Sequence, residues 1–166
     1  YFPRLVVPIS AISINLLQFF IQLVVFLCFY SYFVFKGAEI DVNLKTILVF
    51  PVIVLQTAIL GLGFGTLISS LTTKYKDLIF LLTFGLQLWM FATPIVYPLS
   101  IIPDNYKILA VLNPMTSVVE LFRWSFFGVT SLDFFHILIG LAITFLILLL
   151  GLIAFTKVEK NFIDTV

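Results

Sequence analysis

Long apolar stretches separated by short polar connections dominate the pattern of this chain. Four stretches without Asp, Glu, Lys or Arg predict membrane-spanning helices over about 7–35, 46–72, 78–93 and 136–156. A bilayer core about 30 Å thick needs about 20 apolar residues in a helix. The third stretch is shorter than this because Pro94 and Pro98 interrupt the helical hydrogen bonds. We expect it to cross with the help of anchoring residues at the interface.

The segment over 94–133 is also apolar, but charged residues and prolines cut it into pieces of roughly ten residues, too short to cross a bilayer. We expect a re-entrant helix pair over about 104–129. Irregular backbone at membrane depth persists only where protein or a water-filled cavity satisfies it, so such a pair suggests a pore or a subunit interface. A helix lying flat on the membrane surface fits the same pattern equally well.

Composition confirms the membrane class. Of the 166 residues, 62% are hydrophobic and 10% charged, whereas a soluble domain carries about a quarter charged residues. The net charge of +1 and the lack of a basic cluster exclude nucleic-acid binding. The predicted fold is an all-α membrane protein with four transmembrane helices and a re-entrant pair between the third and fourth.

Basic residues predict the orientation of the helices. An even number of crossings places both ends of the chain on one side, which carries the denser set of basic residues: Arg4, Lys74, Lys76, Lys157 and Lys160. The opposite side has fewer over a longer stretch: Lys36, Lys45, Lys107 and Arg123. The positive-inside rule therefore places both ends in the cytoplasm.

Catalytic chemistry has no visible place in the sequence. There is no phosphate-binding GxxxxGK[ST] loop, no HExxH zinc motif and no GxSxG nucleophile motif, so we expect no catalytic residues, no cofactor and no metal site. The predicted spans also lack the acidic and basic residues that proton- or sodium-coupled carriers use. The energy for any transport must therefore come from a partner.

Uncharged polar and aromatic side chains within and beside the spans predict a lining for a sugar chain, because amides hydrogen-bond to hydroxyls and rings stack on the C–H faces of pyranoses. The candidate lining residues are Gln18, Gln22, Phe26, Gln87, Trp89, Phe91 and Tyr97. Two other interpretations stay open: amides also join helices to one another, and aromatic residues form belts at membrane interfaces.

Several strings in order resemble one known family. They are Tyr1-Phe2-Pro3-Arg4, Tyr75-Lys76-Asp77, the stretch QLWMFATPIVYP over 87–98, LNPMT over 112–116 and ELFRW over 120–124. Together they resemble the permease subunit of bacterial ABC-2 type exporters of surface polysaccharides, which move O-antigen, capsule or teichoic acid chains. Lys76 stands where that family usually has Arg, which keeps the charge but loses the planar guanidinium.

The resemblance implies a six-helix permease of which residues 1–166 form the C-terminal two-thirds, without the amphipathic N-terminal helix and the first two transmembrane helices. It implies a bacterial cytoplasmic (inner) membrane location, membrane lipids around the helices, and a homodimer with a separate ATPase subunit that exports lipid-linked polysaccharide. By the same resemblance, Tyr1, Phe2, Pro3 and Arg4 form the ATPase-coupling loop. The re-entrant gate comprises Asn113, Pro114, Glu120, Arg123 and Trp124. An exporter of drugs or lipids, and a membrane glycan-assembly enzyme, are the alternatives.

Overall fold

All the regular secondary structure in the described part of the chain is helical. The computed structural model describes residues 6–37, 45–75, 77–128 and 133–163. Within these residues the elements are α1 (Val6–Phe35), α2 (Lys45–Lys74), α3 (Leu78–Ala92), the 3-10 turn η1 (Leu99–Ile101), α4 (Asp104–Leu112), α5 (Pro114–Phe127) and α6 (Phe134–Ile163). The prediction of an all-α fold is therefore confirmed.

Three of the described helices are long and apolar enough to cross a membrane, namely Ile9–Phe35, Leu48–Thr73 and Phe134–Val158. They coincide with three of the stretches predicted from the charge pattern. The fourth stretch, 78–93, forms α3, which has only 15 residues. The predicted re-entrant segment, 104–129, contains α4 and α5, and its last residue lies outside the described part.

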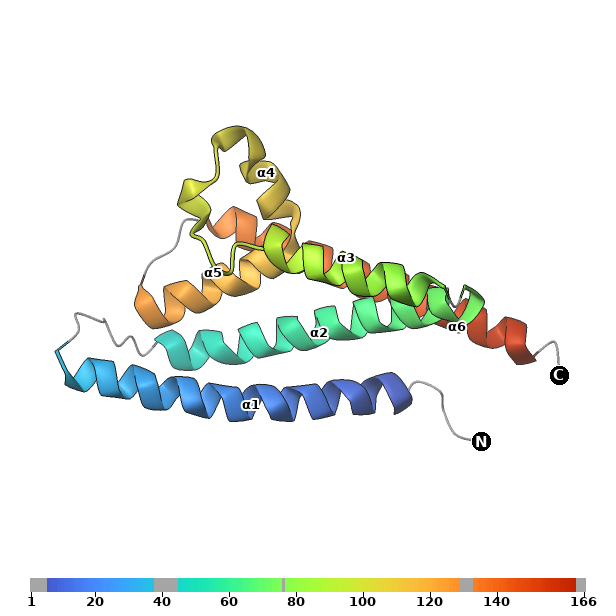
Figure 1. Ribbon diagram of the computed structural model, residues 1–166, viewed down its shortest axis with the longest axis horizontal. Coiled ribbons are helices and arrows are strands. Elements are labelled where there is room, and N and C mark those ends of the chain that lie inside the picture. The colour runs from blue at the N-terminus through green and yellow to red at the C-terminus, as the bar shows by residue number, and fades with distance from the viewer. Residues whose placement is uncertain (1–5, 38–44, 76, 129–132, 164–166) are drawn as a thin grey trace.

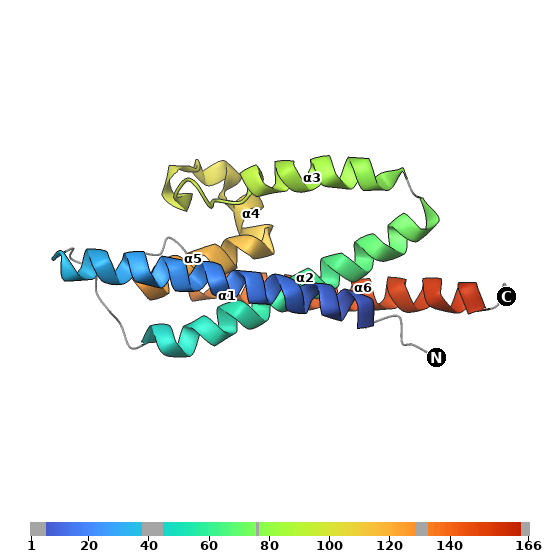
Figure 2. The same ribbon diagram turned by 60° about the horizontal axis from the view of Figure 1, so that its bottom comes forward.

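The helices form an elongated bundle, with α1 alongside α2 and with α6 packed along α2 and α5 (Figure 1). The first residues of α1 and the last residues of α6 lie at the same end of the bundle in both views (Figures 1 and 2). Helices α3 and α5 run in the same direction, and α4, which lies between them in the chain, runs in the opposite direction (Figure 2). The path therefore reverses twice within a short segment.

Small residues let α2, α5 and α6 approach each other closely. A Cβ on Gly63 would lie 2.9 Å from the backbone nitrogen of Leu148, and one on Gly151 would overlap the backbone of α2. Similarly, a Cβ on Gly140 would collide with the side chain of Ser117. Such contacts are typical of membrane helices, in which small residues let backbones pack together.

Aromatic rings join α1 to the far end of α5. The ring centroid of Phe26 lies 5.3 Å from that of Phe122 and 5.1 Å from that of Phe126. The Tyr30 hydroxyl donates a 3.0 Å hydrogen bond to the Phe126 carbonyl oxygen, and the Thr46 hydroxyl donates to the Ser125 carbonyl oxygen. The last carbonyls of a helix lack partners within it, so α1 and α2 together satisfy the end of α5.

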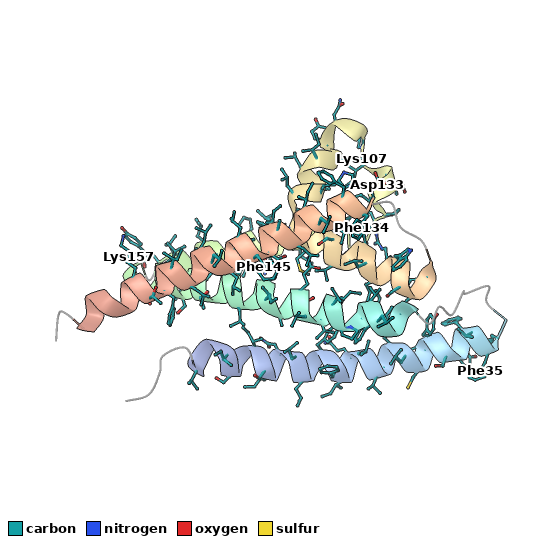
Figure 3. The ribbon with its side chains drawn as sticks, turned by 180° about the vertical axis from the view of Figure 1, so that it is seen from behind. Phe35, Lys107, Asp133, Phe134, Phe145 and Lys157 are labelled. Carbon is teal, nitrogen blue, oxygen red and sulfur yellow. The ribbon has the colours of Figure 1, made fainter. Side chains whose placement is uncertain are left out.

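Charged side chains mark the two ends of α6. Asp133 and Lys107 lie near the start of this helix and Lys157 near its opposite end, whereas Phe145 lies between them (Figure 3). Placing charges at the ends keeps the intervening turns apolar, as a helix in a bilayer requires.

Candidate functional site

The junction between α4 and α5 is fixed by Asn113. Its Oδ1 accepts a 3.1 Å hydrogen bond from the backbone N–H of Met115, so it caps the first turn of α5. Its Nδ2 donates a 2.8 Å hydrogen bond to the Thr93 hydroxyl oxygen, at the end of α3. Pro114 occupies the first helical position, where its missing N–H costs nothing. One amide thus positions the start of α5 and the end of α3 together.

Arg123 makes a second connection between α5 and the chain that follows α3. Its Nη1 lies 3.0 Å from Oε1 of Glu120, and its Nη2 donates to the carbonyl oxygens of Ile95 at 2.9 Å and Tyr97 at 3.3 Å. The side chain of Glu120 is only 2% exposed. Buried carboxylates are tolerated when they are paired and hydrogen-bonded. The predicted gate pair therefore also anchors the connector over 93–98, which we call the α3 connector.

The other two predicted gate residues, Pro114 and Trp124, lie on α5 as well. Pro114, the first residue of α5, is buried. Trp124 is half-buried, and its carbonyl oxygen accepts a hydrogen bond from the backbone N–H of Gly128. Gly128 adopts φ +69°, a left-handed conformation that ends α5 and favours glycine. The five predicted gate residues therefore all lie on α5 or at its N-cap, Asn113. Their role in gating stays a prediction.

A buried polar cluster lies deeper in the bundle and was missed by the sequence analysis. Gln56 of α2 is 1% exposed, and its Nε2 donates to the hydroxyls of Ser117 on α5 at 2.8 Å and Thr144 on α6 at 3.4 Å. The two hydroxyls in turn donate to the carbonyl oxygens of Pro114 and Gly140. Three helices therefore share one amide. The one sequence feature that could have indicated this cluster was a single Gln within an apolar stretch.

The predicted lining residues differ in exposure within the described chain, and their role as a lining stays a prediction. Gln18, Gln22 and Gln87 are exposed, as are Trp89 and Phe91. In contrast, Phe26 is half-buried, and its ring packs against Phe122 and Phe126 of α5. Tyr97 is half-buried and its hydroxyl donates to the carbonyl oxygen of Phe91. Trp89, Phe91 and Tyr97 are thus brought together near the end of α3.

The predicted ATPase-coupling loop, Tyr1, Phe2, Pro3 and Arg4, lies outside the described residues. Its role stays a prediction.

Comparison with known proteins assigns the family. The sequence pattern of the ABC-2 type transporter membrane domain matches residues 1–127, which include α1 to α5. The chain belongs to the ABC-2 type transporter family. The matched region includes both the Asn113 and the Arg123 contacts to the α3 connector.

Curated relatives of this ABC-2 chain are named as export permeases. An O-antigen export system permease protein RfbA of Klebsiella pneumoniae is 27% identical over 164 residues, 98% of this chain and 61% of the relative. A protein of the same name from Myxococcus xanthus is 30% identical over 128 residues, 76% of this chain and 47% of the relative. The chain thus spans about half to three-fifths of the length of these relatives. The resemblance inferred from the sequence motifs is confirmed.

Proposed function

We propose that this ABC-2 chain forms part of the permease subunit of an ATP-driven polysaccharide exporter, which moves lipid-linked glycan across a bacterial inner membrane. The observation that carries the proposal is the similarity, over almost the whole chain, to permeases named for O-antigen export. The structure supports it because the candidate membrane spans carry no Asp or Glu, and their one imidazole and one ammonium group, His136 and Lys157, lie near the two ends of the third span, so their interiors offer no charged relay for a proton or sodium gradient. A separate ATPase subunit and a second copy of the permease complete the proposed assembly.

In the proposed topology, α1, α2, α3 and α6 cross the membrane, and α4 and α5 form a re-entrant pair on the outer side. The double reversal of the chain between α3 and α5 supports this arrangement (Figure 2). Both ends of the chain then face the cytoplasm, in agreement with the distribution of basic residues.

The proposed gate is α5 together with the α3 connector. Because Arg123 and Asn113 hydrogen-bond to both parts, the two move as one unit when the path opens. Trp89, Phe91 and Tyr97 next to this unit supply ring faces for passing sugars, while Gln18, Gln22 and Gln87 lie on surfaces that the remaining part of the assembly could complete into a path.

The experiment that tests the function is a deletion of the gene in its native host, followed by complementation. The intact gene should restore surface glycan, and the intact gene expressed with an ATPase subunit that binds but cannot hydrolyse ATP should not. Intracellular accumulation of lipid-linked glycan in the deletion strain identifies the blocked step as export. Normal surface glycan in the deletion strain, with loss of drug or lipid efflux instead, would assign a different cargo and refute the proposal.

A further inference from the structure

A cavity of about 520 Å³ lies where α3, the segment through η1 and α4 meet. Four of its lining residues combine an apolar surface with a polar group: Trp89, Tyr97, Tyr106 and Asn113. The other described residues of the lining are apolar, and none of the described lining residues is Asp, Glu, Lys or Arg. Its volume falls within the range of about 300–1,000 Å³ that is typical of ligand sites.

Hydrogen bonds and ring contacts hold three of these four polar lining residues in place. Tyr97 is fixed at both ends, because its hydroxyl donates to Phe91 and its carbonyl oxygen accepts from Arg123. Asn113 is fixed by Thr93 and by the N–H of Met115. The Trp89 ring packs edge-on against Phe64, with 5.7 Å between centroids. A site that needs little reorganisation binds its ligand with less loss of entropy.

Two polar groups of the lining remain available to a ligand. The indole N–H of Trp89 and the hydroxyl of Tyr106 have no hydrogen-bond partner among the residues that the structure describes. Both side chains are accessible, with 43% of Trp89 and 61% of Tyr106 exposed. A ligand there meets two aromatic faces, one N–H donor and one hydroxyl.

The chemistry of the lining selects a neutral, hydroxylated ligand. A charged ligand would be desolvated without a counter-charge, at a high cost in free energy. A hydrocarbon chain would leave the indole N–H and the phenol unpaired, and unpaired buried polar groups are also costly. A sugar ring instead presents C–H faces to the aromatic rings and hydroxyls to the polar groups.

We propose that this cavity is a glycan subsite, which holds a short uncharged stretch of the polysaccharide beside the gate, and that Tyr106 of α4 is a contact residue of it. The proposal rests on the proposed function and extends it, because it adds α4 and a defined pocket to the transport path. It also restricts the glycan at this point to neutral sugar units.

Binding can be measured on the full-length permease with its ATPase subunit in lipid nanodiscs, through the fluorescence of Trp89. Mannotriose should produce a saturable change that disappears in Trp89→Phe, whereas the charged trisaccharide trigalacturonic acid should produce none. Tyr106→Ala should weaken mannotriose binding about threefold to tenfold, as expected for the loss of one stacked ring. Tyr106→Phe should retain most of the affinity. Ile108→Ala, an exposed neighbour on α4 outside this lining, is the matched control.

A second variant addresses transport. Leu109→Trp adds bulk to the cavity wall and should abolish mannotriose binding and slow glycan export, while the thermal unfolding temperature of the complex stays close to that of the wild type. Quenching of Trp89 by brominated phospholipid, with no response to mannotriose, would assign the cavity to lipid and overturn the proposal. Equal response to both trisaccharides would overturn the neutral selectivity.

The subsite and the transport function can fail separately. If Tyr106→Ala and Leu109→Trp both export glycan at the wild-type rate and no sugar binds, the subsite is wrong although the exporter assignment stands. If deletion of the whole gene leaves surface glycan unchanged, the exporter assignment itself fails.

Discussion

The guanidinium of Arg123 on α5 donates a 2.9 Å hydrogen bond to the carbonyl oxygen of Ile95, in the connector that follows α3. Ile95 has no special side-chain chemistry, and its role is to offer a backbone acceptor. Through this bond, together with those to Tyr97 and Glu120, a single side chain determines how α5 and the α3 connector are positioned.

We predict that Arg123→Met lowers the free energy of unfolding by about 3 kcal/mol, because it removes one member of the ion pair that the buried Glu120 carboxylate makes with Arg123. Arg123→Lys should recover only part of the loss, since a lysine ammonium cannot reproduce the planar set of donors. Thermal unfolding of the purified protein measures both. The double variant Glu120→Gln/Arg123→Met should be more stable than Arg123→Met alone. Equal stability of wild type and Arg123→Met would contradict the structural role.

The hydrogen bond between Asn113 and Thr93 gives a second prediction. Thr93→Val should lower the free energy of unfolding by about 1 kcal/mol, the usual net value of a hydrogen bond. Asn113→Ala should lower it by about 1–2 kcal/mol beyond the effect of an exposed substitution, because it also removes the cap of α5. The two losses should not add in the double variant, because both single changes break the same bond. Strict additivity in this double-mutant cycle would show that the side chains do not interact.

Glycine positions provide a comparison with a built-in control. Gly140→Ala and Gly151→Ala should each lower the free energy of unfolding by about 2 kcal/mol, because the added methyl group collides with α5 or α2. Gly65→Ala should be neutral or stabilise by up to about 1 kcal/mol, since alanine favours a helix and a Cβ there meets nothing within 4 Å. Similar destabilisation by all three substitutions would argue against the observed packing of α2 and α6.

Substitutions of Phe26 and Phe29 on α1 test whether a ring there packs against α5 or lines the transport path. Phe26→Ala should reduce the unfolding free energy by about 2 kcal/mol, because it removes a half-buried ring from contact with Phe122 and Phe126. Phe29→Ala, at a position where 63% of the side chain is exposed, should have little effect on stability. Glycan export and thermal unfolding measured on both variants separate the two roles. If Phe26→Ala abolishes export but leaves the free energy of unfolding unchanged, the ring of Phe26 contacts the transported glycan and its packing role is wrong.

The helices were predictable from sequence because charges and prolines define where an apolar helix must end. Pro114 at the start of α5 and Gly128 at its end illustrate this, since each residue acts through its own backbone. The same local signals placed Asn113, Glu120 and Arg123 in one segment. Their partners in the α3 connector were not predictable, because a backbone carbonyl acceptor such as that of Ile95 leaves no trace in the sequence.

Choosing among uncharged polar residues requires the tertiary structure. Gln18 and Gln56 both lie within apolar helices, yet Gln18 is exposed and Gln56 joins three helices. Gly61 and Gly65 have the GxxxG spacing that is typical of closely packed membrane helices, but a Cβ on either meets nothing within 4 Å in the described structure, and Gly63 makes the contact instead. Spacing identifies a face of a helix, whereas only its neighbours decide what that face does.

The close approach of α2 and α6 at Gly63 and Gly151 has a mechanical consequence. With backbone against backbone, neither helix can turn about its own axis without driving an adjacent side chain into the other. We therefore expect α2 and α6 to move as one unit and to carry α5 with them through the hydrogen bond between Gln56 and Ser117.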